Sequence, residues 1–180
     1  MNRPDLLIRP GVAADLPGIT SIYAWNVLNG TGTFEIDAPD VAEMTRRHAD
    51  VLDKGLPWLV VEQGGTVTGY AYANHFRPRK AYRFCLEDSV YLAASAQGQG
   101  LGRLLLAELI TRCEALGARQ MLAVIGDSAN HGSVSLHHRL GFEHVGVLKS
   151  TGWKFDRWLD VVMMQKSLGL GDASFAADLA

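Results

Sequence analysis

Three glycines lie within five residues at the junction between an apolar run and a leucine-rich helical pattern, in the stretch Gln97-Gly98-Gln99-Gly100-Leu101-Gly102. Glycine lets the backbone turn tightly and approach a ligand closely. A helix that begins near Leu101 adds N–H groups with no acceptor inside the helix, together with the positive end of its dipole. This arrangement predicts a site that binds a phosphate group.

The spacing of the glycine motif excludes two common phosphate loops. No Lys-Ser or Lys-Thr closes the turn, as a Walker loop requires. A dinucleotide fingerprint needs Gly-x-Gly-x-x-Gly in the first strand-helix unit, whereas here Gly102 follows Gly100 too soon and the unit lies in mid-chain. A plain strand-to-helix turn stays open as the alternative.

Two adjacent carboxylates, Glu87 and Asp88, lie on the strand predicted over 85–92, directly before the glycine motif. Side chains alternate between the two faces of a strand, so these two point apart. Partial burial raises the pKa of a carboxyl group toward neutrality, which suits a general base. One of the two is therefore a candidate base, and a solvent-facing strand acid is the alternative.

A second group of polar residues lies on the helix predicted over 131–140. Asn130 is in a capping position, and Asn130, Ser133 or Val134, and His137 share one helix face. An Asn and a His on one face can hold a polar cofactor arm, although a simple cap explains Asn130 as well.

Two further segments have the composition of an acceptor site. The stretch 75–83 concentrates four cations, of which Arg77 and Arg79 are candidates to bind a carboxylate or phosphinate, because Arg offers a bidentate fork. The loop 29–39 carries Thr33-Phe34-Glu35, which suits a lip that faces substrate. A solvated loop and a plain connection are the respective alternatives.

Periodicity and turn signals predict a chain of alternating strands and helices. Asp15 is a candidate N-cap, Leu104 a core residue of the third helix, and His48 a surface or boundary residue. The predicted strands are 6–8, 58–62, 67–74, 85–92, 121–125, 144–148 and 158–166, and the predicted helices start near 15, 40, 101 and 131. The strand 158–166 is apolar enough to be internal.

Composition narrows the class of protein. The 180 residues suffice for one domain with a substantial core. A net charge of -2 makes a nucleic-acid partner unexpected. The two cysteines form neither a disulfide framework nor a metal cluster, so we expect no metal. We see no leader or membrane-spanning run, and expect a cytoplasmic protein without a membrane partner.

Two ordered signatures resemble the GNAT superfamily of N-acetyltransferases: Gln97-x-x-Gly100-x-Gly102 and Asn130-x-x-Ser133-x-x-Leu136-His137-x-x-x-Gly141-Phe142. The resemblance implies a single α/β (α+β) domain with a mixed, mostly antiparallel twisted sheet flanked by helices. It implies acetyl-CoA as co-substrate, with the pantetheine along the strand end. The implied cofactor-binding residues are Val90, Tyr91, Leu92, Gln97, Gly98, Gln99, Gly100, Leu101, Gly102, Arg103, Asn130 and Ser133. The family often has a Tyr at the position of His137, where it protonates the leaving thiolate, and His can also donate a proton.

Further segments resemble the phosphinothricin and methionine sulfoximine N-acetyltransferase branch, which acetylates the α-amine of small amino-acid analogues. They are Phe76-Arg77-x-Arg79-x-Ala81-Tyr82, Glu87-x-Ser89-Val90-Tyr91 and Gly152-x-Lys154-Phe155-x-x-Trp158-x-Asp160. The match implies Glu87 as base or water-organiser. It also implies Thr33, Phe34, Glu35, Arg77, Arg79 and Trp158 as substrate contacts.

The resemblance further implies a homodimer and an acetyltransferase domain over 1–168. The small-residue tail over 169–180 shows no strong pattern, so we expect it to be flexible. Two rival functions stay open. One is a protein N-terminal or lysine acetyltransferase, for which we expect an open acidic or extended groove. The other is an acyl-CoA-binding regulator without catalysis.

Overall fold

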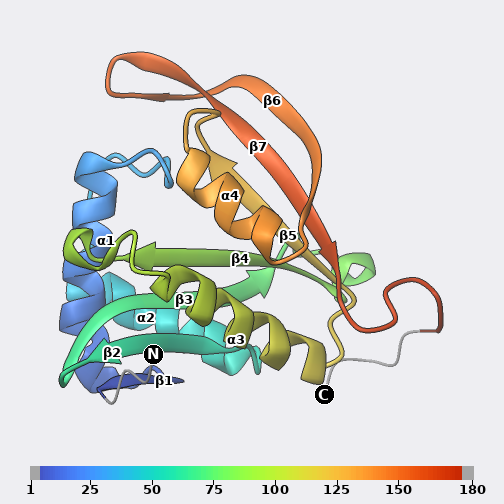
Figure 1. Ribbon diagram of the computed structural model, residues 1–180, viewed down its shortest axis with the longest axis horizontal. Helices are drawn as coiled ribbons and strands as arrows, with labels where there is room; N and C mark the ends of the chain where they lie inside the picture. The colour runs from blue at the N-terminus through green and yellow to red at the C-terminus, as the bar shows by residue number, and fades with distance from the viewer. Residues whose placement is uncertain (1–4, 176–180) are drawn as a thin grey trace.

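The computed structural model describes residues 5–175, in which seven strands form one sheet of order β1-β2-β3-β4-β5-β7-β6 (Figure 1). The strands are β1 (Leu6–Pro10), β2 (Trp58–Gln63), β3 (Thr66–His75), β4 (Cys85–Leu92), β5 (Gln120–Gly126), β6 (Glu143–Lys154) and β7 (Arg157–Ser167). All neighbours are antiparallel except β4 and β5, which are parallel. The prediction of a mixed, mostly antiparallel sheet with an internal last strand is confirmed.

The helices cover the sheet from both sides. They are α1 (Leu16–Asn29), α2 (Val41–Asp53), α3 (Leu101–Ala115) and α4 (His131–Arg139). Helices α1 and α2 lie behind the half formed by β1 to β4 in the view of Figure 1, α3 lies in front of that half, and α4 packs on β5. The second half ends in the long β6–β7 hairpin, which reaches beyond the body of the molecule.

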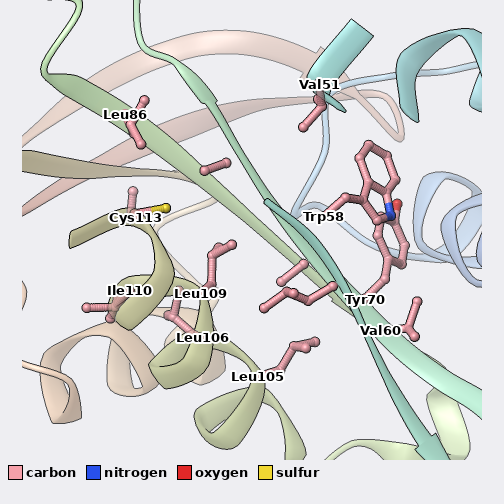
Figure 2. Packing of buried hydrophobic residues seen from close by; sticks show 14 of the residues in the cluster. Val51, Trp58, Val60, Tyr70, Leu86, Leu105, Leu106, Leu109, Ile110 and Cys113 are labelled. Carbon is pink, nitrogen blue, oxygen red and sulfur yellow. The ribbon is translucent and has the colours of Figure 1, made fainter. Parts of the chain in front are cut away.

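The core forms where α3 meets the sheet. Leu105, Leu106 and Leu109 are fully buried, because their spacing of three and four residues puts them on one helix face. Figure 2 shows these leucines on one side of the strands, with Trp58 and Tyr70 on the other side. Burying each large apolar side chain contributes about 1.5–3 kcal/mol of stability. This holds α3, and therefore the loop that precedes it, against the sheet.

A gap opens between β4 and β5 because these strands pair over only three residues each. Cys85–Glu87 pairs with Gln120–Leu122, and beyond that point β4 continues with β3 while β5 continues with β7. The edges that face one another across the gap therefore carry backbone groups with no partner on the other strand. A cleft follows this splay.

Two expectations about single residues are wrong, and a third is correct only in part. Asp15 is the N-cap residue of α1, but its carboxylate makes no hydrogen bond to the helix and accepts from the Val12 amide and from Arg9 instead. His48 is buried beside Trp58, because α2 packs this face onto the sheet. Leu104 is 39% exposed, because it lies off the face of α3 that meets the strands.

The β6–β7 hairpin is longer than its apolar segments indicate. Strand β6 continues past a register irregularity between Leu148 and Gly152 to Lys154. The turn residues Phe155 and Asp156 have φ of 52° and 54°, as in a type I′ turn. Because neither is the Asn-Gly or Gly-Gly that marks such turns, the sequence gives little sign of the extension.

No helix within residues 5–175 is long and apolar enough to cross a membrane. Of the predicted flexible tail, residues 176–180 lie outside the part that the structure describes. Arg119 bonds to Ser174 and Phe175, just before that boundary.

Candidate active site

A cleft of about 1400 Å³ follows the gap between β4 and β5. Its walls are the end of α1, the loop 30–34, the second half of β4, the glycine loop, the end of β5 and helix α4. The volume exceeds the 300–1,000 Å³ that is usual for a drug-sized ligand. It is large enough for two reactants that meet inside one site.

The glycine loop forms part of the cleft wall. Gly98 and Gly100 have φ of 72° and 79°, a left-handed conformation that L side chains rarely adopt. Helix α3 begins directly after them, so the amides of its first turn have no acceptor within the helix. Arg103 in that turn also lines the cleft. These features suit the pyrophosphate of a nucleotide-like ligand.

Helix α4 forms the facing wall and begins with a side-chain cap. The Asn130 side-chain oxygen accepts from the Ser133 amide at 3.2 Å, and the Asn130 amide nitrogen approaches the Gly126 carbonyl at 3.4 Å. The structural reading of Asn130 as a cap is therefore correct. Both Asn130 and Ser133 also line the cleft, as their predicted cofactor contacts require.

His137, one turn after Ser133, is buried, and each of its ring nitrogens has a hydrogen-bond partner; the Ser133 hydroxyl also lies 3.4 Å from Nδ1. Its Nδ1 lies 2.8 Å from the Ser133 carbonyl oxygen, and its Nε2 lies 3.0 Å from Asp88 Oδ2. Burial alone lowers the pKa of this imidazole, but the hydrogen bond and charge of Asp88, with the Ser133 carbonyl, outweigh burial and raise it. His137 lines the cleft on the side of α4.

Glu87 lines the cleft from the other face of β4. Burial is the main cause that raises the pKa of its carboxyl group, and the nearby charge of Asp88 raises it further, while the charge of Arg77 opposes the rise. In the register of β3 and β4, Tyr72 lies opposite Ser89 and so on the face of Glu87, and Tyr72 also lines the cleft. The two adjacent acids thus serve opposite faces, as their alternation predicts.

The loop 30–34, which we call the lip, closes the end of the cleft near the hairpin. The Lys154 ammonium is buried and donates to the Gly30 and Thr33 carbonyl oxygens at 2.9 Å each. The ring of Phe34 lies against Gly126 and Gly152, where a Cβ at either glycine would collide with it. Thr33 and Phe34 line the cleft. The hairpin therefore fixes the lip in place.

Glu35 follows the lip but does not line the cleft. Its carboxylate accepts from Arg47 of α2 at 2.7 Å and from the Tyr23 hydroxyl at 2.9 Å. The same hydroxyl lies 2.9 Å from the Thr33 hydroxyl, and burial is the main cause that raises the pKa of Tyr23 to about 12. This network anchors the lip on the side of α1 and α2.

Several other residues predicted at the site lie away from the cleft wall. Arg77 and Arg79 are exposed and do not line the cleft, although the charge of Arg77 acts on Glu87. Trp158 is 62% exposed, with its ring against Trp153. Gln99 and Leu101 of the glycine motif do not line it either, and Leu101 is a core residue. A contact of Arg77, Arg79 or Trp158 with substrate stays a prediction.

The structure adds wall residues that the sequence motifs do not indicate. Arg157 at the start of β7 donates to Asp127 at 2.6 Å, and both lie on the cleft. Trp25 at the end of α1 lines it as well, and Asn26 donates to the Leu92 carbonyl at 3.1 Å. Of the wall residues, only Asp88 was indicated by a sequence signal beyond the motifs, namely the alternation of side chains on β4. Within residues 5–175 no group of three His, Cys, Asp or Glu side chains could hold a metal ion.

Residues 19–142 match the model of the acetyltransferase (GNAT) family. A phosphinothricin N-acetyltransferase from Alcaligenes faecalis is 57% identical over 160 residues, which cover 89% of this chain and 81% of that protein. An L-methionine sulfoximine/L-methionine sulfone acetyltransferase from Pseudomonas aeruginosa is 41% identical over 162 residues, covering 89% and 94%.

A solved structure of a GNAT superfamily phosphinothricin acetyltransferase from Sinorhizobium meliloti, in complex with acetyl-CoA, is also similar to this chain. The TM-score is 0.93 at 49% identity, and the match covers 96% of this chain and 94% of that one.

Proposed function

Because the chain belongs to the GNAT family of acetyltransferases, we propose that it transfers the acetyl group of acetyl-CoA to the α-amine of a small amino-acid-like acceptor. Phosphinothricin and methionine sulfoximine are the acceptors named for its relatives. The observation that carries the proposal is one continuous cleft that has both the glycine loop and Glu87 on its wall.

The residues present fit acetyl-CoA. Left-handed glycines and the first turn of α3 offer amides to a pyrophosphate, and Arg103 adds a positive charge beside them. The edge of β4 at Val90, Tyr91 and Leu92 faces the gap and offers backbone groups to the amides of the pantetheine arm. Asn130 and Ser133 complete this side from α4.

Glu87 is the proposed base, directly or through a water. An α-ammonium holds its proton at neutral pH, so it must lose that proton before the nitrogen can attack the thioester carbon. A carboxylate whose pKa is raised by burial is a better proton acceptor than an exposed one. A backbone N–H of β4 beyond Glu87 is the proposed donor to the oxyanion that forms.

His137 is the proposed partner of the thiolate that leaves. It lies on the α4 wall, on the face of β4 opposite Glu87, so the two roles are separated across the strand. Orientation of the two reactants supplies much of the remaining rate enhancement.

The lip argues for a small acceptor. Lys154, Phe34 and the Glu35 network hold it across one end of the cleft, where an extended peptide would need an open groove. The arginines of the 75–83 stretch are suited to a carboxylate or phosphinate, and their role as substrate contacts belongs to this proposal.

The test is thiol release from acetyl-CoA across a panel of acceptors. It includes phosphinothricin, methionine sulfoximine, ordinary amino acids, their decarboxylated amines, polyamines and peptides with free N-termini. We expect high kcat/KM only for small amino acids and analogues that keep the carboxylate. Preference for a peptide would favour a protein acetyltransferase, and binding without release on any acceptor would favour a regulator.

We also propose a homodimer, as the resemblance implies. The hairpin carries the large apolar side chains Val145, Leu148, Trp153, Phe155 and Trp158, each about half exposed or more. Such a patch is unusual on a monomer and suits an interface between copies. Sedimentation velocity at micromolar concentration should give a dimer, and Trp158→Lys should weaken it. A wild-type monomer at that concentration would contradict the proposal.

A cytoplasmic location is proposed as well, because Cys85 and Cys113 are both free thiols, as is usual for proteins of a reducing compartment. Fractionation of the producing cells, with the acetyltransferase activity followed in each fraction, tests this.

A further inference from the structure

A buried ion pair joins β4 to α4 at the wall of the cleft, and the proposed chemistry gives its acid, Asp88, no role. The side chains of Asp88 and His137 are 2% and 5% exposed, and their Oδ2 and Nε2 atoms lie 3.0 Å apart. Among the residues that the structure describes, His137 is the only hydrogen-bond partner of the Asp88 carboxylate, because Oδ1 has none.

The partners of the two ring nitrogens determine where the protons are. The Ser133 carbonyl oxygen can only accept, so Nδ1 carries a hydrogen. One further hydrogen must lie between Nε2 and Asp88 Oδ2, since two lone pairs at 3.0 Å would repel. When that hydrogen belongs to the ring, His137 is an imidazolium.

Asp88 sets the charge of His137, because the other groups packed around the pair are neutral, lie on another face or are exposed. On α3, the Cys113 thiol has a pKa raised to about 12, by burial first and by the Asp88 charge second, so it stays neutral. In the turn before β6, the ring of Phe142 lies nearly perpendicular to the imidazole at a centroid distance of 5.0 Å. Glu87 lies on the opposite face of β4, and His138 on α4 is exposed.

We propose that Asp88 is a positioning residue that keeps His137 in its imidazolium form and fixes its ring on the α4 wall of the cleft. The inference rests on the proposed role of His137 and adds the residue that sets its charge. A buried histidine without a carboxylate is neutral, because burial disfavours charge. A neutral ring has no charge with which to attract a departing thiolate. An imidazolium attracts it by its charge, while its two N–H groups stay bonded to Ser133 and Asp88.

Stability alone does not explain the pair. A buried ion pair contributes little compared with apolar side chains of the same volume, because both charges lose their water. What the pair does supply is a defined ring orientation and a defined protonation state, through two hydrogen bonds in opposite directions.

Asp88→Asn is the discriminating variant, because the amide keeps the shape of the carboxylate. Its NH₂ group can donate to Nε2 of a neutral ring whose Nδ1–H still reaches Ser133, so the fold keeps every hydrogen bond. Ring ¹⁵N NMR of the free protein over a pH series reports the state of His137 directly. We expect both nitrogens to be protonated in the wild type at neutral pH, and only Nδ1 in Asp88→Asn.

The pH profile of kcat provides the functional readout. The wild-type rate should fall as pH rises through the raised pKa of His137, and this limb should move down by about one pH unit or more in Asp88→Asn. Asp88→Glu should restore part of the wild-type profile, which a lost packing contact would not allow. Asp50→Asn, which removes an exposed ion pair with Lys54 on α2, should leave the profile unchanged.

A neutral His137 ring in the wild type, or an unchanged ring state and kcat profile in Asp88→Asn, would overturn the inference. The NMR measurement needs no acceptor, so its outcome is independent of the panel that tests the proposed function. Absence of thiol release on every acceptor would contradict that function alone.

Discussion

Replacement of Gly126 by Ala should displace the lip and slow acetyl transfer, because this glycine lies where β5 ends beneath the lip. A Cβ at Gly126 would lie 2.8 Å from Phe34 Cε1 and closer still to the Thr31 carbonyl oxygen. Ordinary contacts of a Cβ begin at 3.4 Å, so the ring must move by at least 0.6 Å and the Thr31 backbone by more. The Thr31 backbone is part of the lip and cannot rotate away as a side chain can.

The size of the effect follows from that displacement. A misplacement of about 1 Å costs on the order of 100-fold in rate, because the reacting atoms no longer meet in line. We therefore expect kcat/KM for the acceptor to fall about 100-fold, or about 2.7 kcal/mol. Asn130, a proposed cofactor contact, bonds to the Gly126 carbonyl. The affinity for acetyl-CoA should therefore fall as well, but only by about threefold, or under about 1 kcal/mol, because the glycine loop keeps its own conformation.

Thiol release at varied acceptor concentration gives kcat/KM, and calorimetry gives the affinity for acetyl-CoA. Gly146→Ala on β6 is the matched control, because its Cβ would meet nothing within 4 Å. Gly152→Ala presses on the same Phe34 ring from β6, so it tests the lip should Gly126→Ala fold poorly. Wild-type acceptor kinetics in both folded variants would refute the assignment of the lip to the acceptor.

The remaining predictions concern the cofactor, the base and the acceptor. Gly100→Val forces a β-branched residue to φ near 79° and should weaken acetyl-CoA binding about tenfold or more in calorimetry. The control Gly65→Val imposes the same strain at φ of 78° in the β2–β3 turn, and it should leave acetyl-CoA binding unchanged. Wild-type kcat/KM should fall as pH drops through the raised pKa of Glu87, because a base acts only when deprotonated. Glu87→Gln should remove this fall at low pH and lower kcat about 100-fold. A kcat near the wild-type value would exclude general-base assistance by Glu87. Arg77→Ala or Arg79→Ala should raise the acceptor KM, because the variant loses a charge-assisted hydrogen bond of about 1.5–3 kcal/mol to the acidic group of the acceptor. Equal activity on the decarboxylated amine would show that no carboxylate is bound.

Much of the fold could be predicted because its signals are local. The alternation of β4 separates Glu87 from Asp88, and the helical spacing in α3 buries Leu105 and Leu109, as the structure confirms. The strands predicted over 58–62 and 67–74 are also confirmed, and Gly64 and Gly65 in the turn between them have positive φ. Predictions failed, wholly or in part, where a tertiary contact outweighs the local preference, as for Asp15, whose carboxylate pairs with Arg9 of β1.

The glycine motif and the Asn130 cap were also identified from the sequence, because each depends on the conformation of a few consecutive residues. The glycines take left-handed φ values, and Asn130 caps α4. Their predicted roles toward a cofactor remain predictions.

Only the tertiary structure decided which distant residues meet. Lys154 bonds to Gly30, 124 positions away in the chain, and Asp88 meets His137, 49 positions away. No periodicity encodes such pairings, because they depend on how β6 and α4 pack once the sheet has formed. The sequence by itself determined the residue types and faces of this protein, while folding decided that Asp88 would contact an imidazole and that the hairpin would hold the lip.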